Sequence, residues 1–279
     1  MNKPMFPAIT FIGGGNMASS LIGGLIADGC PAKNITVAEP DADKLAQLKH
    51  KLGINTATDN ALAVNAANVV ILAVKPQVLQ TVCKNLAQSL QQHKPLIISI
   101  AAGIRSDDID RWSGSNQAIV RCMPNTPALL RCGVTGLYAN ANVSNQQRDI
   151  AQAILAAAGV TLWVDHEVQI DAVTAVSGSG PAYFFLLMEA MIAAGVKLGL
   201  DIKTAQQLTL QTALGAARMA IESDVGAAEL RARVTSKGGT TEAAIQYFKN
   251  NHFSELVSNA LSAANQRAAE LADQLGKDS

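Results

Sequence analysis

The chain has 279 residues, and its 22 basic and 22 acidic side chains give a formal net charge of zero. Without net charge or a basic run, the chain lacks the field that attracts nucleic acids and anionic membranes, so we expect neither as a partner. Its length exceeds that of one typical domain, which predicts two domains, with a single large α/β unit as the alternative. Hydrophobic residues make up 49% and aromatic residues only 4%, a balance that favours closely packed helices over an all-β fold.

The first motif lies near the N-terminus, where the apolar run at residues 9–12 leads into Gly-Gly-Gly-Asn-Met-Ala and then into a helical pattern. A strand followed by G-x-G-x-x-A and a helix is typical of a dinucleotide-binding turn. In that reading Gly13 permits the tight turn, Gly15 admits the pyrophosphate to the helix N-terminus, and Ala18 keeps helix and strand close. The alternative is an α/β turn that binds no nucleotide.

Further apolar runs alternate with helical patterns. We predict strands at residues 9–12, 35–38, 69–74, 96–100, 119–122 and 160–164. This alternation indicates parallel βαβ units, and the continuous apolar runs indicate a sheet covered on both faces. We therefore predict an α/β fold with a Rossmann-type doubly wound sheet. Right-handed crossovers would bring the loops after the strands to the carboxyl edge of the sheet.

Three predicted loops at this edge carry candidate ligand contacts. Glu39 ends the second strand about 20 residues after the glycine motif, where a carboxylate can accept a hydrogen bond from a ribose hydroxyl. Lys75 either meets a charged ligand or is a solvated lysine before the helix-starting Pro76. The segment at residues 123–127, Met-Pro-Asn-Thr-Pro, is either a fixed wall beside a cofactor or a rigid turn.

The β signals stop after residue 165, so we predict a Rossmann domain at 1–165 and an all-α domain at 166–279. The apolar stretch at 182–196 contains Glu189 and is shorter than the roughly 20 residues that span a bilayer. A helix that is apolar on nearly every side must be buried. We expect a second subunit to cover it, because the helical domain is small; a deep core within one chain is the alternative.

The segment at 234–244 places hydroxyls and flexible backbone amides before an amphipathic helix. We expect this helix to begin near Thr240 or Thr241 with threonine as the N-cap. Its free amides and its dipole favour a carboxylate or phosphate, and two glycines allow close approach. An ordinary glycine-rich turn is the alternative, and the hydroxyls at 177–181 likewise act as helix caps or as ligands.

The cysteines and histidines lack the spacing of metal sites. They are Cys30, Cys83, Cys122 and Cys132, with His50, His93, His166 and His252. We expect reduced, mostly buried thiols, no metal and a cytoplasmic location; a catalytic cysteine is the alternative reading. The short lead before the first strand leaves no room for a secretory signal.

Taken together, these motifs closely resemble those of the pyrroline-5-carboxylate reductase family. The matching segments lie at residues 11–17, 73–76, 99–103, 123–127, 177–183 and 235–244, in order along the chain. The resemblance implies hydride transfer from NAD(P)H to L-1-pyrroline-5-carboxylate, the last step of proline biosynthesis. It also implies a helical domain that intertwines with a partner's to form a homodimer, larger assemblies of dimers, and active sites between subunits.

The resemblance also implies roles for individual residues. Residues matching the cofactor site are Gly13, Gly14, Gly15, Asn16, Met17, Asn60, Ala73, Lys75 and Pro76. Those near the nicotinamide are Met123, Pro124, Asn125 and Thr126. Those that hold the substrate carboxylate are Ser236, Gly238, Gly239, Thr240 and Thr241. Solvent, or a hydroxyl such as that of Thr241, would protonate the imine.

Glu39 departs from the family pattern, because the family usually favours NADPH and often has small, polar or basic residues after the second strand. A carboxylate here disfavours a 2′-phosphate. The alternative is that Glu39 turns to solvent, because Pro40 reshapes the turn. The sequence thus leans toward NAD(H) while leaving the choice of NADH or NADPH open. Two other functions remain: a two-domain hydroxyacid-type dehydrogenase, for which Lys197 is the available acid or base, and a non-catalytic NAD(P)-sensing protein.

Overall fold

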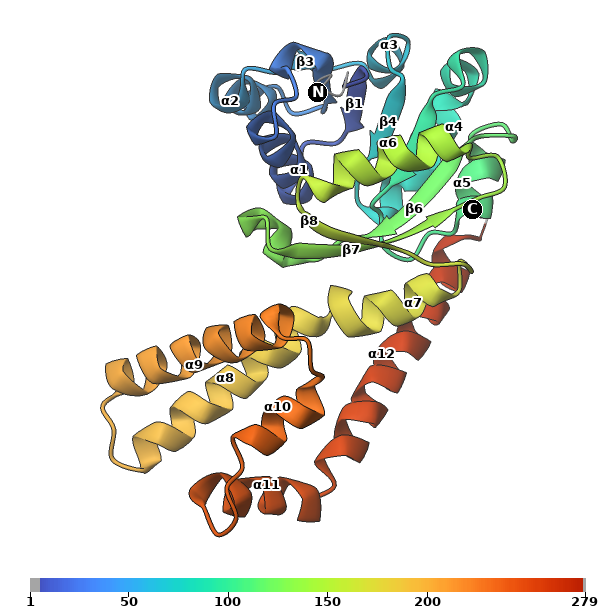
Figure 1. Ribbon diagram of the computed structural model, residues 1–279. Coiled ribbons are helices and arrows are strands. Elements are labelled where there is room, and N and C mark those ends of the chain that lie inside the picture. The colour runs from blue at the N-terminus through green and yellow to red at the C-terminus, as the bar shows by residue number, and fades with distance from the viewer. Residues whose placement is uncertain (1–5, 278–279) are drawn as a thin grey trace. The chain divides into compact units, whose positions relative to one another are not determined.

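The structure, a computed structural model, describes residues 6–277. Its sheet has eight strands in the order β3-β2-β1-β4-β5-β6-β7-β8 (Figure 1). The strands are β1 (Ile9–Ile12), β2 (Ile35–Ala38), β3 (Asn55–Ala57), β4 (Val69–Leu72), β5 (Leu96–Ser99), β6 (Ile119–Met123), β7 (Gly133–Ala139) and β8 (Gly159–Trp163). Strands β1 and β4 lie side by side in the interior of the sheet and are buried throughout.

Two hydrophobic clusters lie on opposite faces of this sheet. The first contains residues of α1 (Asn16–Ala27), α2 (Ala42–Leu52) and α6 (Asn145–Ala156). The second contains residues of α3 (Asn60–Val64), α4 (Pro76–His93) and α5 (Ser106–Trp112). Helices thus cover both faces, as the continuous apolar strands predict. The predicted Rossmann-type doubly wound sheet is confirmed, and its central strands end at the loops that carry the candidate site.

The sheet has two strands that the sequence reading missed, β3 and β7, and β7 runs antiparallel to β6. Gly133 and Gly136 lower the β propensity of the β7 segment. Tertiary packing explains why glycine occupies both positions. A Cβ on Gly133 would lie 2.9 Å from the backbone of Ala128, and one on Gly136 would lie 2.7 Å from the side chain of Val173. Close packing therefore requires glycine where local preference argues against a strand.

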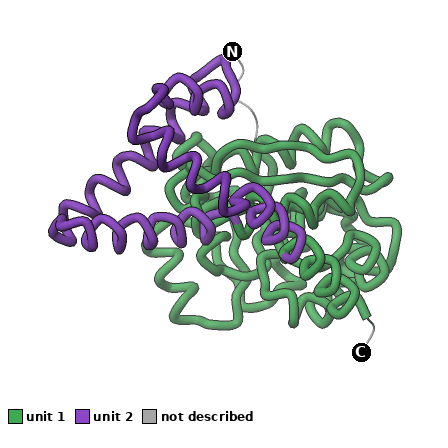
Figure 2. The backbone as a smooth tube through the Cα atoms, turned by 90° about the horizontal axis from the view of Figure 1, so that it is seen from below, with its two compact units in different colours: residues 1–179, 264–279 green, residues 180–263 purple. Residues whose placement is uncertain are grey.

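Two compact units divide the chain, one of residues 1–179 and 264–279, the other of residues 180–263 (Figure 2). The first unit contains the sheet, α7 (Gln169–Val173), the π-helical turn η3 (Thr174–Gly178) and the end of α12 (Phe253–Leu275). Gly103, with a φ of 70°, packs against Leu271 and Leu275 of α12, which explains one family motif by packing. The functional division at residues 165 and 166 stays a prediction.

The second unit consists of helices. They are α8 (Gly180–Lys197), α9 (Ile202–Glu222), α10 (Ala227–Arg233), α11 (Thr240–Asn250) and the first part of α12. On α8, Phe184, Phe185 and Leu186 are 65%, 63% and 67% exposed. The alternative of a deep core within one chain is therefore wrong for this helix, because its bulky apolar side chains face out of the unit. Such a surface is typical of a protein interface.

Length and hydropathy alone do not separate α8 from a membrane span. Among the described residues, one helical run, residues 169–197, is long and apolar enough to cross a bilayer. This run is longer than the stretch on which the sequence argument was based, because α7 and η3 continue into α8. One such helix is weak evidence for a membrane, since apolar helices that pack on other protein helices meet the same criteria.

Candidate cofactor and substrate sites

The glycine turn after β1 has the geometry of a phosphate-binding turn. Gly13 has a φ of 100°, and a Cβ there would lie 2.7 Å from the carbonyl oxygen of Ala73. Gly15 is the N-cap of α1 and has no side chain to satisfy the first amides of the helix. A Cβ on Gly15 would meet no atom of the described chain within 4 Å. The turn thus presents free amides to open space, as an anion requires.

A cavity of about 450 Å³ opens over this turn. It brings together seven of the residues predicted for the cofactor: Gly13, Gly14, Gly15, Glu39, Asn60, Ala73 and Lys75. They come from the ends of β1, β2 and β4 and from the start of α3, which converge at the carboxyl edge of the sheet. The open space at Gly15, the uncapped amides and the lysine fit a pyrophosphate. The residues therefore fit a dinucleotide.

Glu39 points back at the glycine turn. Its Oε2 accepts hydrogen bonds from the backbone N–H of Gly14 at 3.0 Å and from Nζ of Lys44 at 2.7 Å. Burial raises the pKa of Glu39, but the bonds from Lys44 and Gly14 outweigh it and lower the pKa below the ordinary value. The carboxylate is thus ionised near neutral pH and already paired. The sequence reading placed Glu39 here but missed Lys44.

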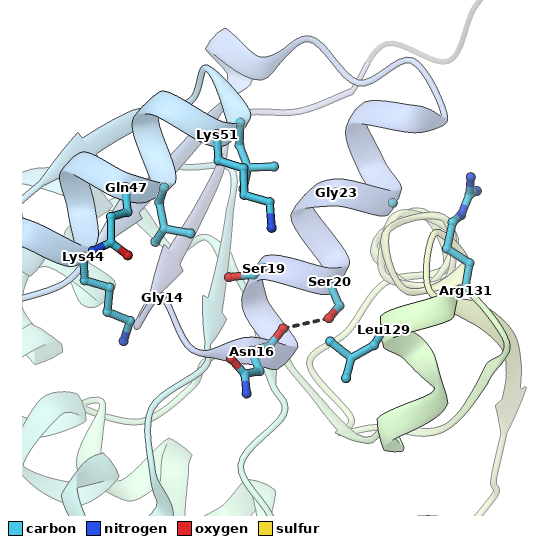
Figure 3. Close-up of a pocket in the computed structure, with 13 residues that line it drawn as sticks. Gly14, Asn16, Ser19, Ser20, Gly23, Lys44, Gln47, Lys51, Leu129 and Arg131 are labelled. Carbon is cyan, nitrogen blue, oxygen red and sulfur yellow. Dashed lines mark hydrogen bonds between the residues drawn. The ribbon is translucent and has the colours of Figure 1, made fainter.

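A second depression, of about 500 Å³, lies between α1 and α2 and shares Gly14 and Lys44 with the cavity. Figure 3 shows Lys44 extending toward Gly14 while Lys51 lies further along the same helix. Asn16, one of the predicted cofactor residues, lines this groove rather than the cavity. Met17 and Pro76 line neither. Lys44 is the cation common to the two spaces.

The predicted nicotinamide wall, residues 123–126, does not line the cavity. It is fixed by the segment before α8 instead. Asn125 donates from Nδ2 to the carbonyl oxygen of Ser177 at 3.1 Å and accepts from the backbone N–H of Val134 at 3.0 Å. A Cβ on Gly178 would meet the terminal methyl of the Met123 side chain, so the two segments lie in close contact. Two motifs far apart in sequence thus form one rigid contact around a π-helical turn, a feature frequent at functional sites.

A buried ion-pair network joins β6 to the segment that leads into α7. Arg121 of β6, 2% exposed, pairs with Glu167 at 3.2 Å and with Asp171 at 3.3 Å. Glu167 also accepts bonds from the backbone N–H and the hydroxyl of Ser106. Burial and the charge of Glu167 raise the pKa of Tyr138. The sequence reading missed this network; the signal available to it was an arginine inside an otherwise apolar strand, which needs a buried partner.

The candidate substrate loop lies in the second unit, and α11 begins at Thr240 as predicted. The predicted threonine N-cap is wrong, because the N-cap is Gly239, which satisfies no amide with a side chain. Glu242 instead accepts from the backbone N–H of Gly238 at 2.6 Å. In the single chain Thr240 and Thr241 are exposed. The loop thus keeps hydroxyls and helix-terminal amides accessible, with one amide held by its own carboxylate.

The thiols do not form a reactive centre. Cys30, Cys83 and Cys122 are buried and Cys132 is exposed. Burial raises the pKa of Cys83 to about 11 and raises that of Cys122 further, which disfavours the thiolate that a nucleophile requires. Within residues 6–277 no three His, Cys, Asp or Glu side chains are grouped to hold a metal ion. The alternative of a catalytic cysteine has no support from this geometry.

Comparison with known proteins assigns both parts of the chain. Residues 167–271 match the family described as pyrroline-5-carboxylate reductase dimerisation, and residues 8–103 match the one described as NADP oxidoreductase coenzyme F420-dependent. A pyrroline-5-carboxylate reductase of Pseudomonas aeruginosa is 58% identical over 97% of this chain and 99% of its own length.

Solved structures agree with this match. The pyrroline-5-carboxylate reductase of Coxiella burnetii has a TM-score of 0.93 at 47% identity, covering 96% of this chain and 99% of that one. The Plasmodium falciparum pyrroline carboxylate reductase, solved with NADP bound, has a TM-score of 0.83 at 30% identity, covering 95% and 98%.

The Rossmann-type sheet, its glycine turn and the dimerisation region define a nicotinamide-dependent oxidoreductase that associates with itself. The chain belongs to the pyrroline-5-carboxylate reductase family. It reduces L-1-pyrroline-5-carboxylate to L-proline by hydride transfer from a nicotinamide cofactor.

Proposed function

We propose that the cavity over the glycine turn holds the cofactor and that the loop at 236–241 holds the substrate carboxylate. The convergence of residues from three strand ends and one helix start on one cavity carries the first assignment. The uncapped start of α11 supports the second, because helix-terminal amides and hydroxyls favour a carboxylate. We assign the cofactor contacts to the matching residues Gly13 to Met17, Asn60, Ala73, Lys75 and Pro76, with residues 123–126 near the nicotinamide.

The bound cofactor supplies the hydride, and the protein supplies position and charge. Fixing a substrate by its carboxylate over a reactive partner can supply a large share of the roughly 7–11 kcal/mol available from orientation. Ser236, Gly238, Gly239 and Thr240 do this in our proposal. Thr241, or solvent ordered by it, delivers the proton to the imine nitrogen. Glu242, bonded to Gly238 in the free chain, would release that amide to the substrate.

We further propose that Glu39 shifts the cofactor preference of the enzyme toward NADH. A 2′-phosphate would approach an ionised carboxylate at the end of β2, whereas a 2′-hydroxyl would donate to it. The hydrogen bond from Gly14 to Glu39 supports this reading, because it turns the carboxylate toward the cavity rather than toward solvent. The preference is then a difference in binding, since the ribose substituent takes no part in hydride transfer.

The exposed apolar side chains of α8 support a homodimer in which this helix lies at the interface. Residues of the substrate loop are exposed in the single chain, which supports completion of the site by a partner. We propose assemblies of dimers beyond this, a cytoplasmic location, and functional domains at 1–165 and 166–279. Nucleic acid and membrane have no place in this proposal, since the net charge is zero.

The deciding assay follows NADH and NADPH oxidation with and without pyrroline-5-carboxylate. We expect turnover only when this or a closely related cyclic imino acid is present. Complete inactivity under both cofactors, in a sample shown to be folded and dimeric, would overturn the site assignments.

A further inference from the structure

We propose that Lys44 is the residue that reads the 2′ position of the cofactor: it meets a 2′-phosphate when NADPH binds and returns to Glu39 when NADH binds. This inference rests on the proposed cofactor site. It differs from the Glu39 reading, because it adds an attractive group for the phosphate. The enzyme would then use both cofactors. Glu39 would favour the binding of NADH, and Lys44 would allow NADPH to bind as well.

The position of the Lys44 side chain carries the inference. Its Nζ lies 2.7 Å from Oε2 of Glu39, the oxygen that also accepts from Gly14. The Lys44 side chain is 38% exposed and that of Glu39 only 14%. Lys44 is thus the more exposed member of the pair, and it lines both the cavity and the groove. A ligand at the end of β2 reaches Lys44 without displacing Glu39 from the glycine turn.

The backbone of Lys44 is fixed by the helix cap, whereas its flexible side chain can rotate between partners. Asp41 caps α2 by accepting from the backbone N–H of Lys44 at 3.0 Å, which places the residue in the first turn of the helix. A long, flexible side chain on a fixed backbone can exchange one anionic partner for another by rotation of its own bonds. The exchange needs no movement of the fold.

Charge explains why the cation is needed for NADPH and not for NADH. A phosphate monoester carries about 1.5 to 2 negative charges near neutral pH. Placed beside the ionised Glu39, it would meet repulsion unless a cation lay between them. Lys75 is the other lysine of the cavity, but it follows β4 rather than β2. Lys51 lines the groove only. Lys44 is the lysine shared by the cavity and the groove.

The test compares Lys44→Met with Lys51→Met, a matched loss of a lysine from the same helix. Dissociation constants for NADPH and NADH are measured by nicotinamide fluorescence and by calorimetry, without pyrroline-5-carboxylate. We expect Lys44→Met to weaken NADPH binding about tenfold or more, since a charge-assisted bond to phosphate is lost. NADH binding should change less than about threefold, and Lys51→Met should change neither. Equal losses for the two cofactors, no loss for NADPH, or undetectable NADPH binding by the wild type would overturn the proposal.

A double-mutant cycle separates contact with the phosphate from support of Glu39. If Lys44 only neutralises or positions Glu39, Lys44→Met should lose its effect on NADPH in a Glu39→Gln background. If Lys44 contacts the phosphate, most of the loss should persist there. Gly15→Val tests the cofactor site itself, because the new side chain would fill the open space over the turn. If Gly15→Val binds both cofactors as the wild type does, the proposed cofactor site is wrong. If Gly15→Val loses binding but Lys44→Met leaves NADPH binding unchanged, only the role of Lys44 is wrong.

Discussion

The two units of the chain handle apolar residues in opposite ways. In the first, β1 and β4 are buried throughout, and even the charged Arg121 is enclosed with carboxylate partners. In the second, three consecutive bulky residues of α8, Phe184 to Leu186, are each more than half exposed. The first unit closes its core with its own elements, and the second exposes an apolar surface of the kind found at protein interfaces.

This difference extends to the candidate sites. In the Rossmann-type unit, the wall at Asn125 is held by bonds to Ser177 and Val134 before any ligand arrives. In the helical unit, the substrate loop has exposed threonines and an amide held by its own Glu242. In our proposal, preorganisation is built into the cofactor half of the chain, while the substrate half depends on association. Four predictions test this contrast.

The largest effect is expected from opening the closed core. Arg121→Met would leave Glu167 and Asp171 without their shared cation, at a cost of about 3–5 kcal/mol for an uncompensated buried charge. Denaturant unfolding should show a much lower midpoint. Arg267→Met, which breaks the exposed pair with Glu270, is the matched control and should cost less than about 1 kcal/mol. Similar shifts for the two variants would mean that the network is solvated and the core less closed than described.

The next effect concerns the open surface. Leu186→Lys places a charge on α8 and should shift the protein toward monomers, because a leucine buried at an interface contributes about 1.5–3 kcal/mol. Leu62→Lys is the control, since Leu62 is 70% exposed on the first unit and Leu186 is 67% exposed on the second. Light scattering at assay concentrations measures the change. An active wild-type monomer, or equal dissociation by the two variants, would contradict an interface on α8.

Sequence patterns predicted the fold where local and tertiary preferences agree. The continuous apolar runs of β1 and β4 predict buried parallel strands, because apolar side chains favour the strand conformation and are also required on both covered faces of the sheet. Strand β7 was missed because the glycines at 133 and 136 are required by close packing against Ala128 and Val173, which lie outside the strand. No local pattern contains that information. The same holds for the antiparallel pairing of β6 and β7, which depends on where the chain returns.

The candidate site shows the same limit at the level of side chains. The glycine turn and Glu39 were predictable, since their spacing follows from the βαβ unit itself. The partner of Glu39 was not, because Lys44 is one of several charged residues at the start of α2 and only the fold selects it. The threonine cap of α11 was wrong because Gly239 takes the N-cap position, leaving both threonines inside the first turn.

A smaller effect is expected in the substrate loop. Thr241→Ala should lower kcat/KM by removing a hydroxyl that orients the substrate, at about 1–3 kcal/mol for a bond to a charged group. Fold and cofactor affinity should survive. Thr235→Ala serves as control, because that hydroxyl donates to the carbonyl oxygen of Arg231 at 2.6 Å and is already engaged. Damaged cofactor binding with normal substrate kinetics would place the loop in a different role.

The smallest effect is expected at Glu39, where the closed half of the chain meets its ligand. Glu39→Ser should improve NADPH use and weaken NADH use, each by about 1 kcal/mol or roughly fivefold, because the 2′ substituent gains or loses a single polar contact. The change should appear in KM rather than kcat, since the substituent is remote from the transferred hydride. Serine also removes the acceptor for Gly14, so thermal unfolding must be measured beside the kinetics to separate a looser turn from a changed preference. A wild type that strongly prefers NADPH, with Glu39→Ser leaving that preference unchanged, would mean that the pairing with Lys44 and Gly14 serves the turn alone and that Glu39 does not face the ribose.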